Sequence, residues 1–265
     1  MLLEIDGLDV SFRSDGGDVT QAAIGVDLSL DRGEVLGVVG ESGSGKSSVA
    51  MSVARLLPSP PAFWPGGRIL LDGRDVLAMP TDELRQIRGR KVGVVFQDPI
   101  GSLSPLHRIG DQLVETVRLH EDVSRRAARA LSLEWLGKVG IPDPEARSRA
   151  FPHELSGGMQ QRVMIAMALM LGPDLIIADE PTTALDVTTQ AQVLKLMKGL
   201  LAANSGLLLI THDLGVVANM ATKLAVMKEG RVVETASDAA EFFKSPKHPY
   251  SRALVREAKR MELAA

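Results

Sequence analysis

The segment VLGVVGESGSGKSSVA, residues 35–50, decides the fold of this chain. Residues 35–40 form a short valine-rich run that ends in glycine, which predicts a buried strand. Residues 40–47, GESGSGKS, match the pattern G-x-x-x-x-G-K-[S/T] at every fixed position. A helix is predicted over residues 47–57, where Pro58 ends it. A strand, a glycine-rich loop and a helix in this order are typical of a loop that binds phosphate groups.

Each fixed position of this loop has a physical role. The glycines let the backbone turn so that N–H groups point at phosphate oxygens, and the helix that follows adds its positive end. Lys46 is expected to hold the β- and γ-phosphates, and the Ser47 hydroxyl to reach Mg²⁺. The alternative is a glycine-rich turn that binds nothing, which the complete motif disfavours. The predicted ATP-binding residues of the loop are Gly40, Glu41, Ser42, Gly43, Ser44, Gly45, Lys46, Ser47 and Ser48.

Strands and helices alternate along the rest of the chain, which predicts an α/β fold with a mainly parallel sheet. The middle of the chain differs, because residues 98–155 contain no buried strand run and indicate a helical subdomain. The predicted strands lie within residues 2–30, 35–40, 68–73, 91–97, 175–180 and 206–213, followed by a hairpin over 223–234. The predicted domains are a nucleotide-binding core over residues 1–97 and 156–240, the helical subdomain over 98–155 and a C-terminal tail over 241–265.

Composition excludes several classes of protein. The 265 residues include no cysteine, which rules out disulfides, thiolate metal sites and a cysteine nucleophile. The net charge of -3 argues against a dedicated nucleic-acid binder. The longest apolar run, residues 163–171, falls short of the roughly 20 residues that a membrane span needs. The acidic start, with Glu4 and Asp6, is unlike a signal peptide, so we expect a cytoplasmic protein that reaches a membrane only through a partner.

Two acidic residues end the strand predicted over residues 175–180, LIIADE. A strand that ends in Asp179 places this carboxylate at the carboxyl edge of the sheet, where the phosphate loop also opens. Asp179 is therefore a candidate Mg²⁺ ligand, directly or through water, and Glu180 is a candidate to polarise an attacking water. Taken alone, an acid pair after a strand is usually a solvated strand end, but the phosphate loop favours the functional interpretation.

A second anion site is predicted at LSGGMQQR, residues 155–162, because a serine and two glycines offer a hydroxyl and bare amides at a helix N-terminus. One chain has only one γ-phosphate to hold, so this site is expected to serve a second nucleotide. Gln97 ends a strand and could reach the metal or a water, and His212 ends another and could contact the γ-phosphate. Considered in isolation, each of these two residues is more often structural.

In this order the motifs resemble those of ABC-transporter ATPase subunits, and the resemblance covers essentially the whole chain. The corresponding segments are the Walker A loop at residues 40–47, the Q-loop at Gln97, the signature at 155–160, the Walker B strand at 175–179 with Glu180, the D-loop at 184–186 and the switch histidine at His212. By resemblance Phe12 matches the aromatic residue that stacks on adenine, although an early phenylalanine is usually part of a core. Met159 stands where many members have glutamine, which puts a side-chain hydrogen bond there in doubt.

The resemblance implies a P-loop NTPase core, with N-terminal antiparallel strands beside the parallel sheet and an inserted helical subdomain. It implies an ATPase whose subunits pair head to tail, with each ATP between the Walker A loop of one subunit and the signature of the other. The implied signature contacts to the partner's ATP are Leu155, Ser156, Gly157, Gly158, Met159 and Gln160, with Asp186 in the D-loop. The implied catalytic residues are Lys46, Gln97, Glu180 and His212, and the implied Mg²⁺ ligands are Ser47, Gln97 and Asp179.

Four segments, at residues 96–113, 151–162, 178–194 and 245–251, resemble those of the ATPases of peptide and nickel importers. The implied partners are a related, non-identical ATPase subunit, two transmembrane permeases and, indirectly, an external binding protein, on the cytoplasmic face of the inner membrane. Some dipeptide-type members carry an extra cysteine cluster. This sequence lacks that cluster and in this respect resembles the nickel-type members. Residues 98–112 are expected to receive a short permease helix, or else to be an ordinary surface loop. The competing functions are an efflux ATPase and an ABC-type ATPase that acts on nucleic acid.

Overall fold

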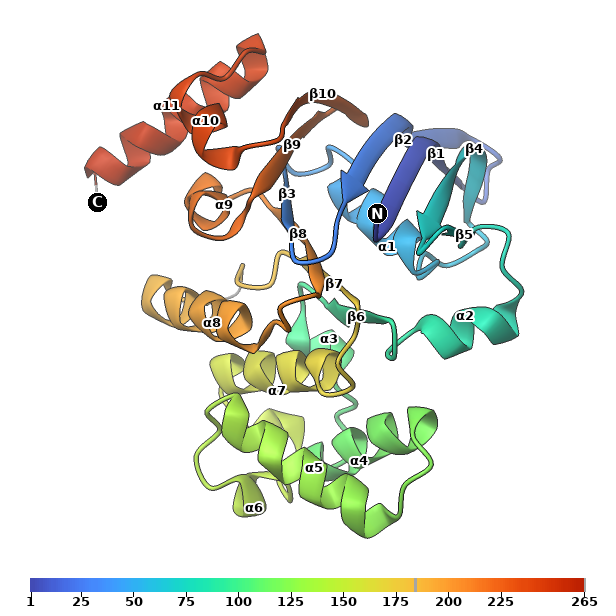
Figure 1. Ribbon diagram of the computed structural model, residues 1–265, viewed down its shortest axis with the longest axis vertical. Coiled ribbons are helices and arrows are strands. Elements are labelled where there is room, and N and C mark those ends of the chain that lie inside the picture. Colours follow the sequence, from blue (N-terminus) through green and yellow to red (C-terminus); the bar gives the residue numbers. More distant parts are fainter. Residues whose placement is uncertain (184, 265) are drawn as a thin grey trace. The chain divides into compact units, whose positions relative to one another are not determined.

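The computed structural model describes residues 1–183 and 185–264 (Figure 1). Its contacts divide the chain into two compact units, the first made of Met1–Arg85 with Asn204–Ala265 and the second of Gln86–Ala203. The phosphate loop belongs to the first unit, and the predicted helical stretch belongs to the second. The predicted domain boundaries at residues 97, 155 and 240 follow the motifs rather than these contacts and stay a prediction.

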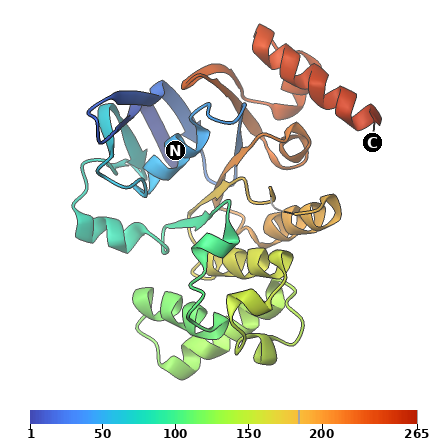
Figure 2. The same ribbon diagram turned by 180° about the vertical axis from the view of Figure 1, so that it is seen from behind.

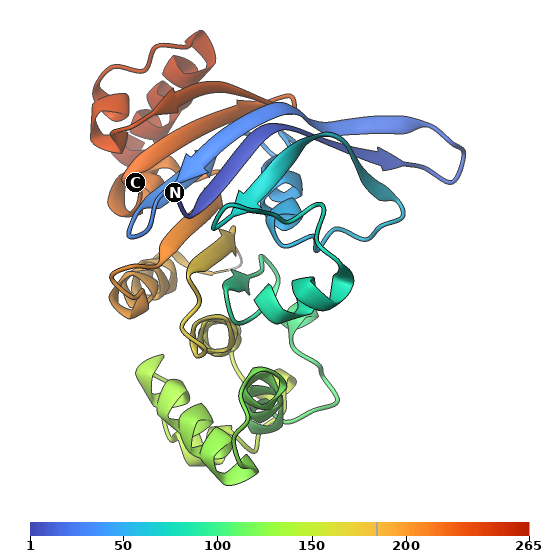
Figure 3. The same ribbon diagram turned by 45° about the vertical axis from the view of Figure 1, so that its right-hand side comes forward.

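The first unit contains an antiparallel sheet in the order β2-β1-β4-β5, which confirms the predicted N-terminal antiparallel strands. Strands β1 and β2 form a long hairpin (Figure 3), and β4 pairs with the other edge of β1. Alternate residues of β1, such as Leu3, Ile5, Leu8 and Val10, are buried, as expected of a half-covered sheet. The strands are β1 (Leu3–Arg13), β2 (Val19–Leu30), β4 (Ala62–Leu71) and β5 (Arg74–Asp75).

Parallel strands form the centre of the first unit. Strand β3 (Val35–Val39) pairs in parallel with both β8 (Gly206–Thr211) and β9 (Lys223–Lys228). Strand β10 (Arg231–Ala236) joins β9 antiparallel, as the predicted hairpin requires. Every residue of β8 is buried, which explains its unbroken apolar sequence.

Helices connect these strands. Helix α1 (Lys46–Val53) contacts β1 and β2 of the antiparallel sheet and also β8, whereas α9 (Leu214–Met220) packs on β3 and β8. Helix α2 (Thr81–Ile87) follows the antiparallel strands along the chain.

Helix α1 is shorter than the sequence predicts. It ends at Val53 rather than at residue 57, because Arg55 adopts a left-handed conformation with φ 48°. The amides of Arg55 and Leu56 bond back to the carbonyls of Ser52 and Met51, both at 2.9 Å, and so close the last turn. The local backbone, rather than Pro58, therefore ends this helix.

The second unit is built around α7 (Gly157–Leu169), which packs against β6 (Val92–Val95) and several helices (Figure 2). Strand β6 pairs in parallel with β7 (Leu175–Asp179). A Cβ on Gly93 of β6 would lie 2.2 Å from the Ala168 carbonyl oxygen, so this strand and α7 approach at backbone distance. The remaining elements are α3 (Pro99–Ser102), α4 (Ile109–His120), α5 (Arg125–Lys138), α6 (Pro144–Arg147), a short 3-10 helix (Pro152–Glu154) and α8 (Val187–Leu200). Residues 98–155 thus contain helices and no strand.

The C-terminal tail forms α10 (Ala239–Lys244) and α11 (Pro249–Ala264), which both contact α9. The turn between them is held by Glu234 of β10, whose two carboxylate oxygens accept the amides of Lys247 and His248 at 2.8 Å each. Burial opposes ionisation of Glu234, yet the hydrogen bonds that it accepts hold its pKa below the ordinary value. Among the described helices, none has both the length and the apolar character needed to cross a bilayer.

Replacement of this carboxylate should loosen the tail in a pH-dependent way. In Glu234→Gln a single acceptor oxygen faces two amides, so we expect the free energy of unfolding at pH 7 to fall by about 1 kcal/mol. Because the folded-state pKa is depressed, the contribution of Glu234 is present above its unfolded pKa of about 4.3 and is lost as the pH falls through the lower folded value.

Urea denaturation at pH 7 and in acid measures this difference. Glu115→Gln, on the exposed surface of α4, is the matched control and should be neutral at both pH values. A stability gap for Glu234→Gln that stays constant down to the lowest pH would contradict the assignment.

Candidate functional site

The phosphate loop is wedged between two backbone segments of the first unit. Gly40 has φ 155° and Gly45 has φ 96°, and a Cβ on either would lie 2.1 Å from a carbonyl oxygen, that of Met227 or Ala22 respectively. The Ser44 carbonyl accepts a 3.1 Å hydrogen bond from the Gly230 amide in the β9–β10 turn. The glycines are therefore required for close approach as well as for backbone conformation.

The Lys46 ammonium group lies inside the loop. Its Nζ donates to the carbonyl oxygens of Gly40 and Glu41, both at 2.8 Å, and to the Ser44 hydroxyl at 3.3 Å. The residue is only 4% exposed, so this positive charge is buried at the start of α1. Gly45 precedes α1 and provides no side-chain cap for it. A phosphate group at this helix end would meet the first-turn amides and the Lys46 charge together.

Two predicted site residues of the first unit leave the same sheet edge. Val39 and Thr211 are paired across the parallel strands β3 and β8, so Gly40 and His212 follow neighbouring strand ends. The His212 side chain is exposed. The strand pairing thus brings both residues to one edge of the sheet, and the contact of His212 with a terminal phosphate stays a prediction.

The remaining predicted site residues of the first unit are exposed or half-buried. Ser47 is exposed on the first turn of α1, and Ser48 beside it is half-buried. Phe12 is half-buried on β1, opposite Thr20 and Ala62. The role of Phe12 in stacking on adenine stays a prediction.

Gln97 and Glu180 are brought together in the second unit. Val95 and Ala178 are paired across β6 and β7, so both residues follow the same sheet edge. The Gln97 amide nitrogen donates to Glu180 Oε2 at 3.1 Å. The Thr183 hydroxyl donates to the same oxygen at 2.8 Å. These two donors orient the Glu180 carboxylate.

The backbone at Glu180, just after the end of β7, has an unusual conformation. Glu180 has φ 44°, in the left-handed region, while Asp179 before it ends β7 and is 7% exposed. The two adjacent acids therefore differ in burial, since Asp179 is buried and Glu180 is half-buried, and their separate roles stay a prediction. Thr183 is a contact that the sequence interpretation missed, and its position three residues after Glu180 is the signal that could have identified it.

The signature segment forms the start of α7. Ser156 is the N-cap residue, and its Oγ accepts the Met159 amide at 3.4 Å. A hydroxyl that accepts one bond keeps its proton and can still donate to an anion. Gly157 and Gly158 occupy the first helical positions and add backbone amides without side chains. This end of α7 thus has the features of the predicted second anion site.

The other signature residues support this helix end from within. Leu155 is 6% exposed, and Gln160 is 7% exposed. The Gln160 amide nitrogen donates to the carbonyls of Pro152 and Leu155 at 2.8 and 3.1 Å, which holds the turn before the helix. Met159 is half-buried and contributes its backbone amide to the cap.

The predicted D-loop is described in part, because Ala184 lies outside the described residues. Asp186 is the N-cap of α8, where its Oδ1 accepts the Thr189 amide at 3.0 Å and its Oδ2 accepts the Thr189 hydroxyl at 2.7 Å. The Thr189 hydroxyl, more than the amide, holds the pKa of Asp186 below its ordinary value. Leu185 is half-buried.

The predicted metal ligands have the chemistry that Mg²⁺ prefers. Ser47, Gln97 and Asp179 offer a hydroxyl, an amide and a carboxylate oxygen. Across residues 1–183 and 185–264, no three acidic or histidine side chains are grouped so that they could hold a metal by themselves. Each of these donor types suits Mg²⁺, which commonly completes its shell with substrate phosphate oxygens and water.

Comparisons with known proteins identify the family of this chain. A family model described as ABC transporter matches residues 24–183. The oligopeptide transport ATP-binding protein OppD of Bacillus subtilis is 50% identical over 255 residues, which are 96% of this chain and 71% of that protein. A probable peptide ABC transporter ATP-binding protein of Sinorhizobium fredii is 48% identical over 256 residues, which are 96% of this chain and 76% of that protein.

A solved structure shares the fold. It is described as the dimeric structure of a post-hydrolysis state of the ATP-binding cassette MJ0796 bound to ADP and Pi. The TM-score is 0.78 at 29% sequence identity, and the match covers 88% of this chain and 97% of that chain.

The contact between Gly45 and Ala22 gives a specific expectation for the loop. In Gly45→Ala the new methyl group would collide with the Ala22 carbonyl oxygen, and the alanine would have to adopt a strained positive φ. Nucleotide binding should therefore be lost. Gly43→Ala is the matched control, since Gly43 has φ 79° but no atom within 4 Å of its Cβ position, and it should lose only about 1 kcal/mol of stability. Thermal melting and ATP titration of both variants test this. Equal effects at the two glycines would show that close packing is irrelevant.

Proposed function

This chain belongs to the ABC transporter family and is an ATPase, and from that premise we propose that it energises the import of peptides. The observation that carries the proposal is 48–50% identity, over 96% of the chain, to proteins named as peptide transport ATP-binding subunits. Nickel or a nickel chelate stays the alternative cargo that the sequence predicts. The cargo itself would be selected by membrane and external partners.

The active form in this proposal is a head-to-tail pair of ATPase subunits. Each subunit would contribute its phosphate loop to one ATP and its signature helix end, with Ser156, to the other ATP. Two helix N-termini whose chemistry suits an anion, at α1 and at α7, support this arrangement. The related cassette, described as dimeric and bound to ADP and Pi, supports it as well. The partner is proposed to be a related, non-identical subunit.

Hydrolysis would depend on positioning and on electrostatics, as in other phosphoryl transfers. Glu180, held by Gln97 and Thr183, would orient the attacking water and accept its proton. Lys46 and His212 would stabilise the charge that develops on the γ-phosphoryl group. Ser47, Gln97 and Asp179 would hold Mg²⁺, which would supply positive charge beside the phosphates.

The surface that would receive a permease lies between α3 and α4. The buried Gln112 side chain organises it, since its Oε1 accepts the Ser104 amide at 2.9 Å and its Nε2 donates to the His107 carbonyl at 2.9 Å. Leu106, between those two residues, is 82% exposed. A fixed loop that presents a large apolar side chain suits a short apolar helix as partner. The chain would thus act at the cytoplasmic face of the membrane, beneath two permeases.

Substitution of Glu180 separates binding from hydrolysis. Glu180→Gln keeps the side-chain shape and removes the charge, so we expect near-wild-type ATP affinity, a loss of turnover of at least a hundredfold and a trapped dimer. Lys46→Ala should weaken ATP binding itself, because it removes the buried cation. ATP titration, phosphate release and gel filtration measure the three quantities. Wild-type turnover in Glu180→Gln would refute the role assigned to Glu180 in hydrolysis. Unchanged ATP affinity in Lys46→Ala would refute the role assigned to Lys46 in binding.

Crosslinking tests the proposed partners. The chain contains no cysteine, so a single introduced thiol reacts at a known position. Leu106→Cys should crosslink to a permease in an assembled, transport-competent complex. Leu119→Cys, which is 72% exposed on α4 outside the loop, is the matched control and should react less. Two results together would support import: copurification of two permeases and a second ATPase subunit, and ATP turnover that depends on peptide. Copurification with nucleic acid, or transport outward, would favour one of the competing functions.

A further inference from the structure

The C-terminal tail touches the phosphate loop through one side chain. The Glu41 amide donates a 3.1 Å hydrogen bond to the hydroxyl oxygen of Tyr250, a residue 209 positions away in the sequence. Both residues belong to the first unit, and Tyr250 lies in the first turn of α11. None of the motifs that define the ATP site includes this residue.

Several contacts hold Tyr250 in place. Its own amide donates to Nδ1 of His248 at 3.2 Å, and the turn before it is fixed by Glu234, as described above. The Lys228 ammonium lies 5.3 Å from the centre of the Tyr250 ring, a cation–π distance. Because both ends of the tyrosine are restrained, its hydroxyl is pre-positioned against the loop.

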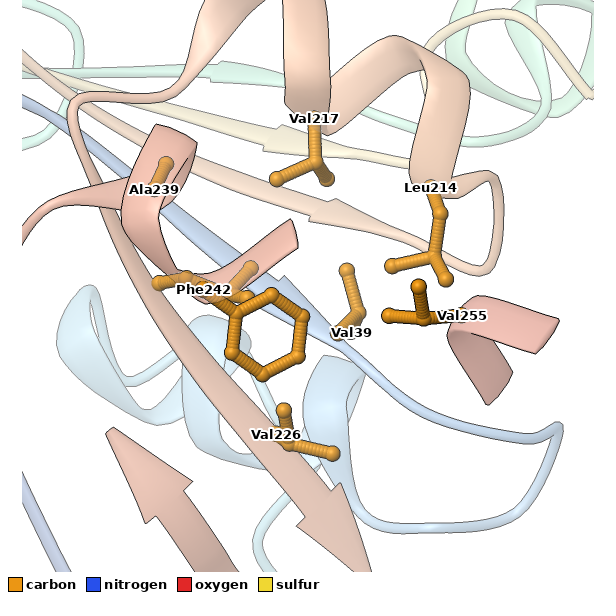
Figure 4. Close-up of a cluster of buried hydrophobic side chains, with 8 residues drawn as sticks. Val39, Leu214, Val217, Val226, Ala239, Phe242 and Val255 are labelled. Carbon is orange, nitrogen blue, oxygen red and sulfur yellow. The ribbon is translucent and has the colours of Figure 1, made fainter. Parts of the chain in front are cut away.

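An apolar cluster ties the tail to the strand that leads into the loop (Figure 4). Phe242 of α10 and Val255 of α11, at 3% and 5% exposure, belong to the same buried cluster as Val39, the last residue of β3. Leu214 of α9, two residues after His212, also belongs to it. The tail is therefore anchored where the loop begins and beside the element that follows His212.

The Tyr250 hydroxyl completes the restraint on one peptide group. The peptide that joins Gly40 and Glu41 has its carbonyl oxygen bonded to Lys46 Nζ at 2.8 Å and its N–H bonded to Tyr250. This peptide is the first of the loop, and the Glu41 carbonyl that follows it is a second acceptor for Lys46. Burial raises the pKa of Tyr250, so the phenol stays neutral near pH 7.

We propose that Tyr250 is a positioning residue for ATP: it fixes the Gly40–Glu41 peptide, and through that peptide it sets the Lys46 ammonium for the triphosphate. The proposal rests on the proposed use of this loop to bind ATP. Tyr250 acts through the loop and needs no contact with the nucleotide. The tail would then be a working part of the ATP site rather than an appendage.

The test compares two variants of the full 265-residue chain. Tyr250→Phe removes one hydroxyl and keeps the ring, and we expect the Kd for ATP in calorimetric titration to rise by about threefold to tenfold. KM should rise with it while kcat is unchanged. Phe243→Leu, which disturbs the tail where Phe243 packs edge-on against Phe242, is the matched control. It should lower the melting temperature at least as much and leave the Kd within twofold.

Two further readouts separate positioning from general stability. Hydrogen exchange of the Glu41 amide, measured without nucleotide, should be faster in Tyr250→Phe and unchanged in Phe243→Leu. Tyr250 is the one tyrosine in the sequence, so ¹³C labelling of tyrosine gives a single ring signal, which should shift when ATP binds. An unchanged Kd in Tyr250→Phe, or an equal rise in both variants, would overturn the proposal while ATP binding stands.

Failure of ATP binding can be distinguished from failure of the positioning role of Tyr250. If wild-type protein did not bind ATP, the proposed use of the loop would fail. The exchange of the Glu41 amide would still report on the tyrosine, and equal exchange in wild type and Tyr250→Phe would overturn its positioning role.

Discussion

The phosphate loop depends on a meeting of three backbone segments with no room for side chains between them. Gly45 lies against the Ala22 carbonyl of β2, and the Ser44 carbonyl accepts the Gly230 amide of the β9–β10 turn. The Gly230 carbonyl in turn accepts the Ile24 amide of β2 at 2.8 Å. The antiparallel sheet and the parallel strands of the first unit must therefore be correctly placed before the loop can take its shape. The fold and the binding chemistry are linked at this junction.

The chemistry of the site follows from what each segment contributes. The first unit supplies a buried cation at a helix N-terminus, and the second supplies an oriented carboxylate and a second helix end that favours anions. Each of these parts is ordinary when considered alone. Their occurrence in one chain is consistent with an ATPase of the ABC transporter family.

Much of this could be predicted from sequence, because the decisive signals are local. The strand before the loop, the lysine, the acids after β7 and the hairpin turn at Glu229 and Gly230 all lie within short, patterned segments. The end of α1 was predicted wrongly, because Arg55 takes a left-handed conformation and no neighbouring glycine indicates it in the sequence.

The contacts of Thr183 and Tyr250 were also missed, for different reasons. Thr183 lies three residues after Glu180, so the local pattern contained the signal for its contact. The contact between Tyr250 and Glu41 joins positions 209 apart in the sequence, and local patterns carry no information about such pairs. The division of the chain into domains, the adenine contact of Phe12 and the roles of individual catalytic residues stay predictions.

The N-cap at Ser156 has a consequence for how mutations in this chain should be interpreted. The same oxygen closes α7, the helix around which the second unit packs, and carries the proton that a neighbouring subunit's nucleotide would accept. In the proposed dimer a genetic lesion at this codon would therefore be pleiotropic, because the yield of folded protein and communication between subunits would decline together. Threonine is the replacement most able to conserve both properties, so natural variation at this position should be confined to hydroxyl side chains.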